Sequence, residues 1–475
     1  MTKNKLGIAI TAATLSALLL TGCGDSSSSN DSDDEVEATR IHDTRTFEPA
    51  AEIAFTASES ASAYYGTYEG IQGPAVYAAE IPDGWDGGGL IMYTHGYRGE
   101  GSELAVSVPD AAWRATVLAA GYAWAASSYS ANYYDVRAAI EDTNKLALEV
   151  VDYIEADFGQ AYEAPQQVLI SGYSLGGHTA AAAVDRENME RTAYKVHYQG
   201  ALPFCQAEQN QFQWLGDYTR VVEELSGIDV PDEEYQDNLP SMLQALFVIE
   251  DGSVTWEPAN ENGERVKQIA MNLTGGDRPI FYDFGFANPG LQGAVLGTGG
   301  RGGDINGILA RNYYDNVDRE YRWTNGDTKT VDEENFNEAI ERVAADDGVN
   351  PLRDDGVRWL PLVKGDFDVP VLTLHTLGDF YVPFRHQQLY REGAIENGSE
   401  DLLVQRAIRA PSHCDFTGSE ISKALSDWLK WVNSGDKPEG DEVLDPAVVA
   451  DPQYGCDHTI NDDTRDRSAL PSCGT

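Results

Sequence analysis

The feature that most constrains this chain is an apolar run that passes through a glycine-bounded serine into a stretch of small residues. Residues 168–171 are Val-Leu-Ile-Ser, residues 172–176 are Gly-Tyr-Ser-Leu-Gly, and residues 178–182 are His-Thr-Ala-Ala-Ala. The two glycines lack side chains, so they allow strand and helix backbones to approach closely. The pattern predicts a strand, a sharp turn and a helix, with Ser174 exposed at the turn.

A serine held at such a turn is typical of nucleophilic catalysis. The serine hydroxyl is a weak nucleophile, and it reacts only beside a base and near donors that stabilise the developing negative charge. A five-residue pattern with two glycines also occurs by chance, but here a strand precedes it and a helix follows it. Ser174 is therefore predicted to be a catalytic nucleophile.

Strand and helix patterns alternate from about residue 75 onward, which predicts a mostly parallel sheet flanked by helices. The expected strands, besides the one before Ser174, are 75–81, 90–94, 122–126, 193–204, 369–374 and 402–408. The expected helices, besides the one after Ser174, are 136–158, 384–396 and 419–432.

Residues 206–365 interrupt this alternation, because they are rich in Trp, Tyr, Gly and acidic residues and show no succession of strands. They are predicted to form an inserted lid over the strand ends, which would select substrates and exclude water. Six of its aromatic side chains are candidates to line an acyl pocket, although for each one packing within the lid is the simpler role. These residues are Trp214, Trp256, Phe281, Tyr282, Phe284 and Phe286.

The serine motif and the order of the strands resemble the α/β-hydrolase superfamily, over roughly residues 75–205 and 366–435. The resemblance implies an α/β-hydrolase fold, with a mostly parallel central sheet flanked by helices and a large lid insertion. We expect the core to comprise residues 49–205 and 366–435. The resemblance also implies that the catalytic acid and then the histidine follow the nucleophile along the chain.

The acid and the base can be assigned in that order. The pair Gly378-Asp379 follows an expected strand and resembles the acid turn of the family. This resemblance implies that Asp379 orients the histidine and stabilises its charged form. Considered alone, Asp379 also fits a turn or a helix cap. His413 follows the last strand and would act as general base. Three other histidines are interpreted as packing or surface residues: His178, His386 and His458.

The oxyanion hole requires two backbone donors. The amide of Leu175, next to the nucleophile, is expected to be one of them. The segment from His95 to Gly99 resembles the His-Gly loops of esterases and lipases, which implies the amide of Tyr97 as the second donor, with Gly96 as its nearest competitor. His95 is expected to be a structural hydrogen-bonding residue.

Apart from Cys23, the chain has four cysteines, Cys205, Cys414, Cys456 and Cys473. The N-terminal residues described below indicate an exported chain, in which an even set of cysteines predicts two disulfides, and four cysteines allow three pairings. We favour Cys456 with Cys473 because both lie in the polar tail of residues 436–475, which leaves Cys205 with Cys414.

Cys414 beside His413 resembles tannases and feruloyl esterases, in which a disulfide joins the histidine loop to the residue before the serine. In this chain the residue before the serine is Tyr173, so a disulfide between Cys414 and Cys205 would brace the histidine loop by another route.

The N-terminus has the pattern of an export signal. Residues 1–5 carry two lysines, and the apolar run 6–20 is too short to span a membrane. Residues 20–23, Leu-Thr-Gly-Cys, resemble a bacterial lipobox, which implies that residues 1–22 are removed and Cys23 is lipidated; an ordinary signal peptide is the alternative. The acidic, Ser-rich residues 23–48 are predicted to be a flexible tether. The chain is thus expected to be an exported lipoprotein, held at the periplasmic face or the cell surface by its lipid anchor.

The charge balance limits the partners. With 33 basic and 78 acidic residues the net charge is −45, which excludes a general nucleic-acid binder because phosphate contacts need clustered Lys and Arg. An acidic surface stays soluble in concentrated salt, so a marine or halophilic source is our hypothesis.

Two further patterns are set aside. Residues 297–302 match Gly-x-Gly-x-x-Gly but lack a surrounding strand-helix-strand unit, and a lid turn explains them. The acidic cluster of Asp315, Asp318, Glu320 and Asp327 lacks the spacing of a calcium loop. No cofactor and no metal are predicted.

Together these patterns predict a serine-dependent carboxylic ester hydrolase that acts outside the cytoplasm on small-molecule or polymeric esters through an acyl-enzyme on Ser174. A polyester or polysaccharide-ester depolymerase, a serine peptidase and an acyltransferase use the same triad and remain alternatives. A non-enzymatic binding module of the same fold is a further one. The sequence leaves the acyl and alcohol specificity and the oligomeric state open.

Overall fold

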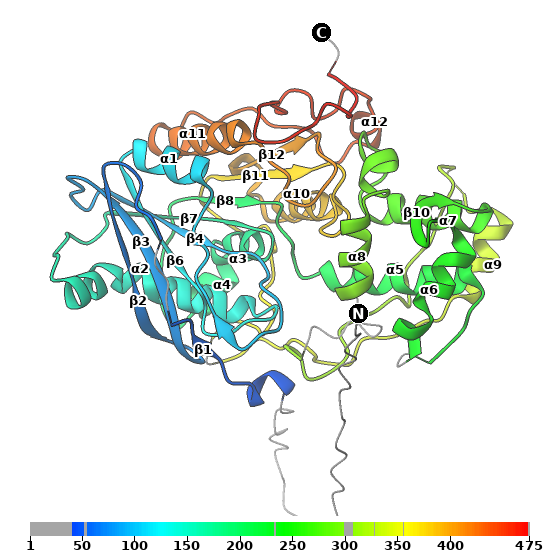
Figure 1. The fold of residues 1–475 in the computed structure, drawn as a ribbon, viewed down its shortest axis with the longest axis horizontal. Coiled ribbons are helices and arrows are strands. Elements are labelled where there is room, and N and C mark those ends of the chain that lie inside the picture. Colours follow the sequence, from blue (N-terminus) through cyan, green and yellow to red (C-terminus); the bar gives the residue numbers. More distant parts are fainter. Residues whose placement is uncertain are drawn as a thin grey trace, which may run out of the picture. The chain divides into compact units, whose positions relative to one another are not determined.

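An eight-stranded sheet forms the centre of the fold (Figure 1). Across the sheet the strands run in the order β12-β11-β8-β7-β4-β6-β3-β2. β3 pairs antiparallel with both of its neighbours, and the other pairs are parallel. The strands are β2 (Ala61–Gly70), β3 (Gly73–Pro82), β4 (Gly89–Thr94), β6 (Tyr122–Ser127), β7 (Gln167–Tyr173), β8 (Ala201–Phe204), β11 (Val371–Thr376) and β12 (Leu403–Ile408). The predicted α/β-hydrolase architecture is confirmed.

The structure, a computed structural model, describes residues 40–51, 55–231, 234–298, 307–326, 328–354 and 356–473. The predicted signal peptide 1–22, the lipidation site Cys23 and the tether up to residue 39 lie outside the described residues. No helix in the described part of the chain has both the length and the apolar composition needed to cross a membrane.

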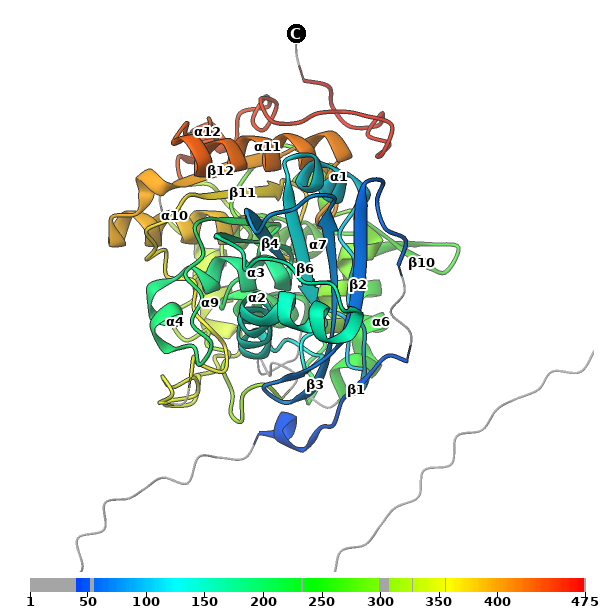
Figure 2. The ribbon, with the colours of Figure 1, turned by 90° about the vertical axis from the view of Figure 1, so that its left-hand side faces the viewer.

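Helices cover both faces of the sheet, which is why its strands are apolar along their whole length. Along β4, Leu90 and Met92 enter one core cluster, and Ile91 and Tyr93 enter the other. The first face is covered by α2 (Val136–Phe158), α3 (Leu175–Ala183) and α10 (Arg385–Asn397). The second is covered by α1 (Ala111–Ala119) and α11 (Gly418–Ser434), which lie side by side (Figure 2).

The local sequence explains where the long helices begin and end. The side chain of Asp135 accepts a hydrogen bond from Ala138 N at the start of α2, and Gly159 ends the helix with a φ of 70°. Thr417 and Glu420 form a capping box at the start of α11.

One predicted strand is much shorter than expected. Of residues 193–204, only Ala201–Phe204 form a strand, β8. The amides of Ala193 and Tyr194 donate to the carboxylate of Glu141, so the start of this segment bonds to a side chain in α2. Bonds to the backbone of β7 are made close to β8, where Gln199 N donates to Val168 O at 3.0 Å. The prediction is wrong for residues 193–200.

A mostly helical region separates β8 from β11 along the chain. The two strands are parallel neighbours in the sheet, so this region runs from the carboxyl end of β8 back to the amino end of β11, at the opposite ends of the strands. Figure 1 shows its helices grouped on one side of the sheet. Its elements are α5 (Gln211–Ser226), α6 (Tyr235–Leu246), β9 (Phe247–Glu250), β10 (Ser253–Pro258), α7 (Glu261–Leu273), the π-helical turn η3 (Phe281–Gly285), α8 (Pro289–Thr298) and α9 (Val331–Ala339). They lie within the predicted insertion, residues 206–365.

Residues 40–48, predicted as the end of the tether, are folded. The side chain of Arg40 donates to Ile308 O at 3.0 Å, and His42 Nε2 lies 3.0 Å from Asp135 Oδ2. Both residues are buried, and β1 (Glu48–Pro49) pairs with β5 (Glu103–Leu104). The prediction is wrong here because the polar side chains find buried partners far along the chain, which composition does not reveal.

Candidate active site

Ser174 occupies a strained turn between β7 and α3. Its φ of 61° and ψ of −119° are unusual for a residue with a side chain. A Cβ added to Gly172 would lie 1.9 Å from Thr94 Oγ1, and one added to Gly176 would lie 2.0 Å from Thr94 O. Both glycines are therefore needed for the close approach of β4 to the turn. The Thr94 hydroxyl strengthens this contact, because it lies 2.7 Å from Gly176 O.

The structure brings together the three side chains that the sequence singled out. His413 Nε2 lies 2.8 Å from Ser174 Oγ, and His413 Nδ1 lies 2.5 Å from Asp379 Oδ2. Asp379 is fully buried, and its other carboxylate oxygen accepts from Val382 N at 3.0 Å. The imidazole is thus fixed between a hydroxyl and a carboxylate, and the carboxylate is itself held in place.

A residue of the insertion, which sequence reasoning missed, supports the turn that carries Asp379. Arg278 is buried and donates from Nε to Leu377 O at 2.8 Å and from Nη1 to Gly276 O at 2.9 Å. Burial lowers its pKa to about 9, opposed by the charge of Asp379, so the guanidinium stays cationic at neutral pH. No local pattern marks Arg278, because its partner turn lies about a hundred positions further along the chain.

The same turn packs tightly against the insertion backbone. A Cβ added to Gly285 would lie 2.2 Å from Gly378 O. On the opposite side, Gly378 N donates to Ala410 O at 2.9 Å. The acid turn is therefore held between the insertion and the chain leading to His413.

A disulfide joins Cys205, just after β8, to Cys414, just after His413. Cys414 Sγ lies 3.3 Å from His413 Nε2. Cys456 and Cys473 form the second bond, so the structure contains both predicted disulfides. In the described residues, the potential metal-ligand atoms that converge belong to Cys205, His413 and Cys414, and the bond between the two sulfurs accounts for this cluster.

The other histidines considered as bases have different partners. His178 lies 3.0 Å from the Tyr134 hydroxyl and 2.8 Å from Pro361 O, and burial lowers its pKa to about 4. His386 is buried beside Glu208, and burial lowers its pKa well below the usual value. His458 lies near Asp441, in the tail, and burial lowers its pKa to about 4.

The loop after β4 passes directly beside Ser174. A Cβ added to Gly96 would lie 3.3 Å from Ser174 Cβ. The His95 ring stacks on Tyr129 at 4.0 Å and contacts Gly96 O and Ser128 O, at 2.7 and 3.1 Å. Burial lowers the pKa of His95 to about 4, and in the neutral form the ring donates to one of these two carbonyl oxygens.

Ser174 lines a small recess. Four of its lining residues are aromatic, namely Tyr97, Tyr134, Phe212 and Tyr381. Gln211, Phe212 and Leu215 come from α5, so the insertion forms one wall. None of the described residues that line the recess is charged.

The six aromatic residues that the sequence offered as pocket candidates lie outside this lining. Trp214 packs on Phe380 and donates to its carbonyl oxygen at 2.5 Å. Phe281 and Phe286 also pack on Phe380. Packing is thus the observed role of these three residues.

Comparison with known proteins gives limited similarity. No family model matches the chain. A curated relative, the o-phthalyl amidase of Xanthobacter agilis, is 36% identical over 76 residues, and the match spans 16% of this chain and 17% of the relative.

Similar solved structures include feruloyl esterase B from Aspergillus oryzae, with a TM-score of 0.42 and 14% identity over 81% of this chain and 89% of that one. The rice cell wall degrading esterase LipA from Xanthomonas oryzae gives a TM-score of 0.35 and 16% identity over 78% and 87%. An acylaminoacyl peptidase gives a TM-score of 0.38 and 10% identity over 82% of this chain and 44% of that one.

Proposed function

We propose that this protein is a serine-dependent carboxylic ester hydrolase. The observation that carries the proposal is the position of His413, whose two ring nitrogens contact Ser174 Oγ and Asp379 Oδ2. In this arrangement the neutral imidazole accepts the serine proton while the carboxylate stabilises the imidazolium that forms. Asp379, His413 and Ser174 come from three separate parts of the chain, so their convergence at a strained turn supports a catalytic role over chance.

The proposed reaction has two half-reactions. Ser174 Oγ attacks the ester carbonyl carbon, and His413 Nε2 takes the hydroxyl proton. The bond to the leaving oxygen then breaks, and His413 returns the proton to the departing alcohol, which leaves an acyl-enzyme. Water repeats the sequence: His413 removes its proton, the carboxylic acid departs, and Ser174 regains its hydrogen.

The oxyanion would be stabilised by two backbone amides. Leu175 is the first residue of α3, where helix amides have no acceptor within the helix. Tyr97 follows Gly96 in the loop beside Ser174 and lines the same recess. We assign the two donors to these residues, each of which would contribute about 3 kcal/mol of transition-state stabilisation.

The lining of the recess supports an uncharged acyl group. Its aromatic walls favour a flat or aliphatic group, and the described residues of its lining include no cation to balance a carboxylate on the substrate. The net charge of −45 also opposes an anionic substrate. We infer that neutral aromatic or short aliphatic esters are the preferred class.

We propose further that the enzyme acts outside the cytoplasm, anchored through a lipid on Cys23. The two disulfides support this proposal, because such bonds persist in oxidising compartments. An anchored exported hydrolase also suits a polymeric ester that is too large to import.

Amide hydrolysis is the second candidate, because the curated relative that is 36% identical over 76 residues is named an amidase. The assay compares p-nitrophenyl acetate, butyrate and benzoate with p-nitroanilides of the same acids and with a phthalate monoester. We expect turnover of the neutral esters, weak turnover of the anilides and the lowest kcat/KM for the phthalate monoester. Faster cleavage of anilides would favour the amidase, and inactivity on every ester would exclude the esterase.

A further inference from the structure

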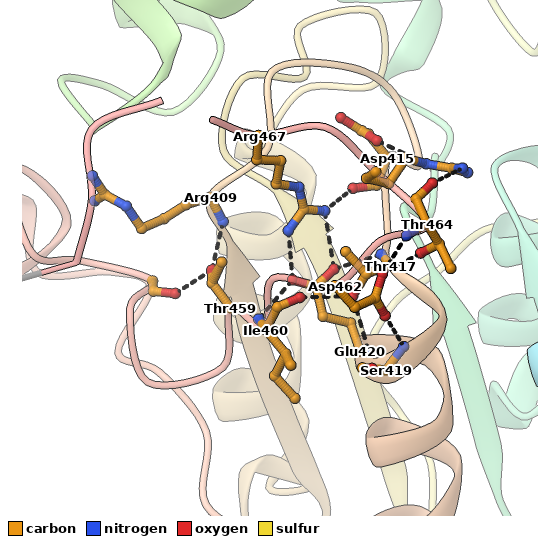
Figure 3. A network of polar contacts seen from close by, with 12 residues as sticks. Arg409, Asp415, Thr417, Ser419, Glu420, Thr459, Ile460, Asp462, Thr464 and Arg467 are labelled. Carbon is orange, nitrogen blue, oxygen red and sulfur yellow. Dashed lines mark hydrogen bonds and ion pairs between the residues drawn. The ribbon is translucent and has the colours of Figure 1, made fainter. Parts of the chain in front are cut away.

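The C-terminal tail contacts both ends of the loop that carries His413 (Figure 3). This histidine loop, residues 409–417, joins β12 to α11. The loop is neither strand nor helix, so it lacks the backbone hydrogen-bond ladder that would fix a regular element. The tail segment 459–467 lies against it and supplies side chains and backbone groups that bind it.

At its first end the histidine loop is held through Arg409. The amide of Arg409 donates to Thr459 Oγ1 at 2.9 Å, as Figure 3 shows. Its guanidinium reaches further into the tail and donates to Pro452 O at 2.8 Å and Tyr454 O at 3.1 Å. The chain is therefore tied to the tail as it leaves β12.

At its second end the loop is held by a buried arginine of the tail. Arg467 donates to both carboxylate oxygens of Glu420, at 2.6 and 3.0 Å, and also to Asp415 O. The side chains of Arg467 and Glu420 are 3% and 0% exposed, so this charged pair is shielded from water. Asp415 is two residues from His413, so Arg467 fixes the backbone next to the proposed base.

The start of α11 is fixed by the same segment. Gly418 N donates to Thr464 Oγ1 and Ser419 N to Asp462 Oδ2, both at 2.9 Å. Ile460 N donates to Glu420 Oε1 at 2.9 Å. The bonds from Gly418 and Ser419 satisfy helix amides that would otherwise lack acceptors, and all three bonds couple the helix start to the tail.

Two disulfides restrain the elements on either side of His413. The Cys456–Cys473 bond closes the part of the tail that contains Thr459 and Arg467. The Cys205–Cys414 bond ties the histidine loop to the end of β8. The loop is thus held between the sheet and a closed segment of tail.

We propose that residues 459–467 position His413 for proton transfer, with Arg467 as the principal positioning residue. Arg467 does not touch the reacting atoms, so it acts through Asp415 and the helix start. This inference rests on the proposed hydrolase function. A displacement of about 1 Å in a reacting group costs on the order of 100-fold in rate, so loosening the loop should lower kcat more than it changes KM.

The test compares Arg467→Met with Arg186→Met in the full chain. Arg186 lies outside the tail and the histidine loop, its side chain is 52% exposed and it pairs with Asp366, so it is the control for loss of an arginine. With p-nitrophenyl butyrate we expect kcat to fall about 10- to 100-fold in Arg467→Met with KM nearly unchanged, and to stay within about twofold of wild type in Arg186→Met. Arg467→Lys, which keeps the charge but loses the planar fork, should be intermediate.

Proton NMR provides a readout that does not depend on turnover. The low-field resonance of the proton between His413 Nδ1 and Asp379 should be sharp in wild type and Arg186→Met and broadened or absent in Arg467→Met. If Arg467→Met does not fold, Thr459→Val, which removes the acceptor for Arg409 N, serves in its place and should show the same loss of kcat on a smaller scale.

The outcomes separate the two proposals. Wild-type kcat and an unchanged low-field resonance in folded Arg467→Met would overturn the positioning role, while Ser174-dependent turnover by wild type would leave the hydrolase standing. No Ser174-dependent turnover by wild type would overturn both.

Discussion

At the scale of single residues, burial sets the protonation of two titratable groups close to the recess. Glu208 directly follows Ala207, which lines the recess. The Glu208 carboxyl is buried, and one of its oxygens accepts a hydrogen bond from Asn210 Nδ2 at 3.1 Å. Burial raises the pKa of Glu208 to about 8. Its neighbour His386 is neutral for the same reason, so the two form an uncharged pair near neutral pH.

The raised pKa of Glu208 makes its own contribution to stability depend on pH in a defined direction. The unfolded chain releases the Glu208 proton near pH ~4.3, whereas the folded chain retains it up to about pH 8. At this carboxyl the folded state thus binds more protons between these values, and the contribution of Glu208 to the free energy of unfolding falls as pH rises through this window. Glu208→Gln stays neutral, so it should lose less stability between about pH 5 and pH 8 than wild type does.

Urea unfolding at both pH values measures this difference. The exposed Glu396→Gln is the control and should follow wild type. Parallel pH profiles for wild type and Glu208→Gln would show that Glu208 does not hold its proton in the folded state.

At the scale of elements, the insertion does more than form a wall of the recess, because Arg278 binds the turn that carries Asp379. Arg278→Met removes these bonds and leaves buried carbonyl oxygens without donors. We expect the free energy of unfolding to fall by about 3 kcal/mol and kcat to fall with it, because the acid turn loosens. Arg311→Met, in an exposed position of the same region, should leave both unchanged.

Thermal unfolding and ester turnover of the two variants test this prediction. If Arg278→Met retains both the stability and the kcat of wild type, the insertion does not support the acid turn.

The elements also show what the sequence can and cannot predict. The helix expected at 136–158 is found at those bounds, since its apolar periodicity is strong and glycine follows it. Motif and chain order led to Ser174, Asp379 and His413, which lie in contact. Arg278 and Arg467 were missed, because contacts between buried side chains distant in sequence leave no local pattern.

At the scale of the whole molecule, acidic charge dominates, with a net charge of −45. Self-repulsion among these charges opposes folding at low ionic strength, and salt screens it over about 10 Å at 0.1 M. We therefore expect Tm to rise as sodium chloride is added. We also expect KM for an anionic ester to fall with salt while KM for a neutral ester changes little.

Differential scanning calorimetry and a two-substrate salt titration measure these effects. A Tm that stays constant or falls with salt would contradict the proposed adaptation to saline conditions. Highest activity without added salt would count equally against it.

The central claim is that Ser174, His413 and Asp379 act together as one catalytic unit. The most direct measurement is the steady-state hydrolysis of p-nitrophenyl butyrate by wild type, Ser174→Ala and His413→Ala, each checked for folding by circular dichroism. We predict that both folded variants lose on the order of 10⁴-fold or more in kcat, and that the double variant loses no more than either single one. Wild-type turnover by folded Ser174→Ala, or additive losses in the double variant, would contradict the account.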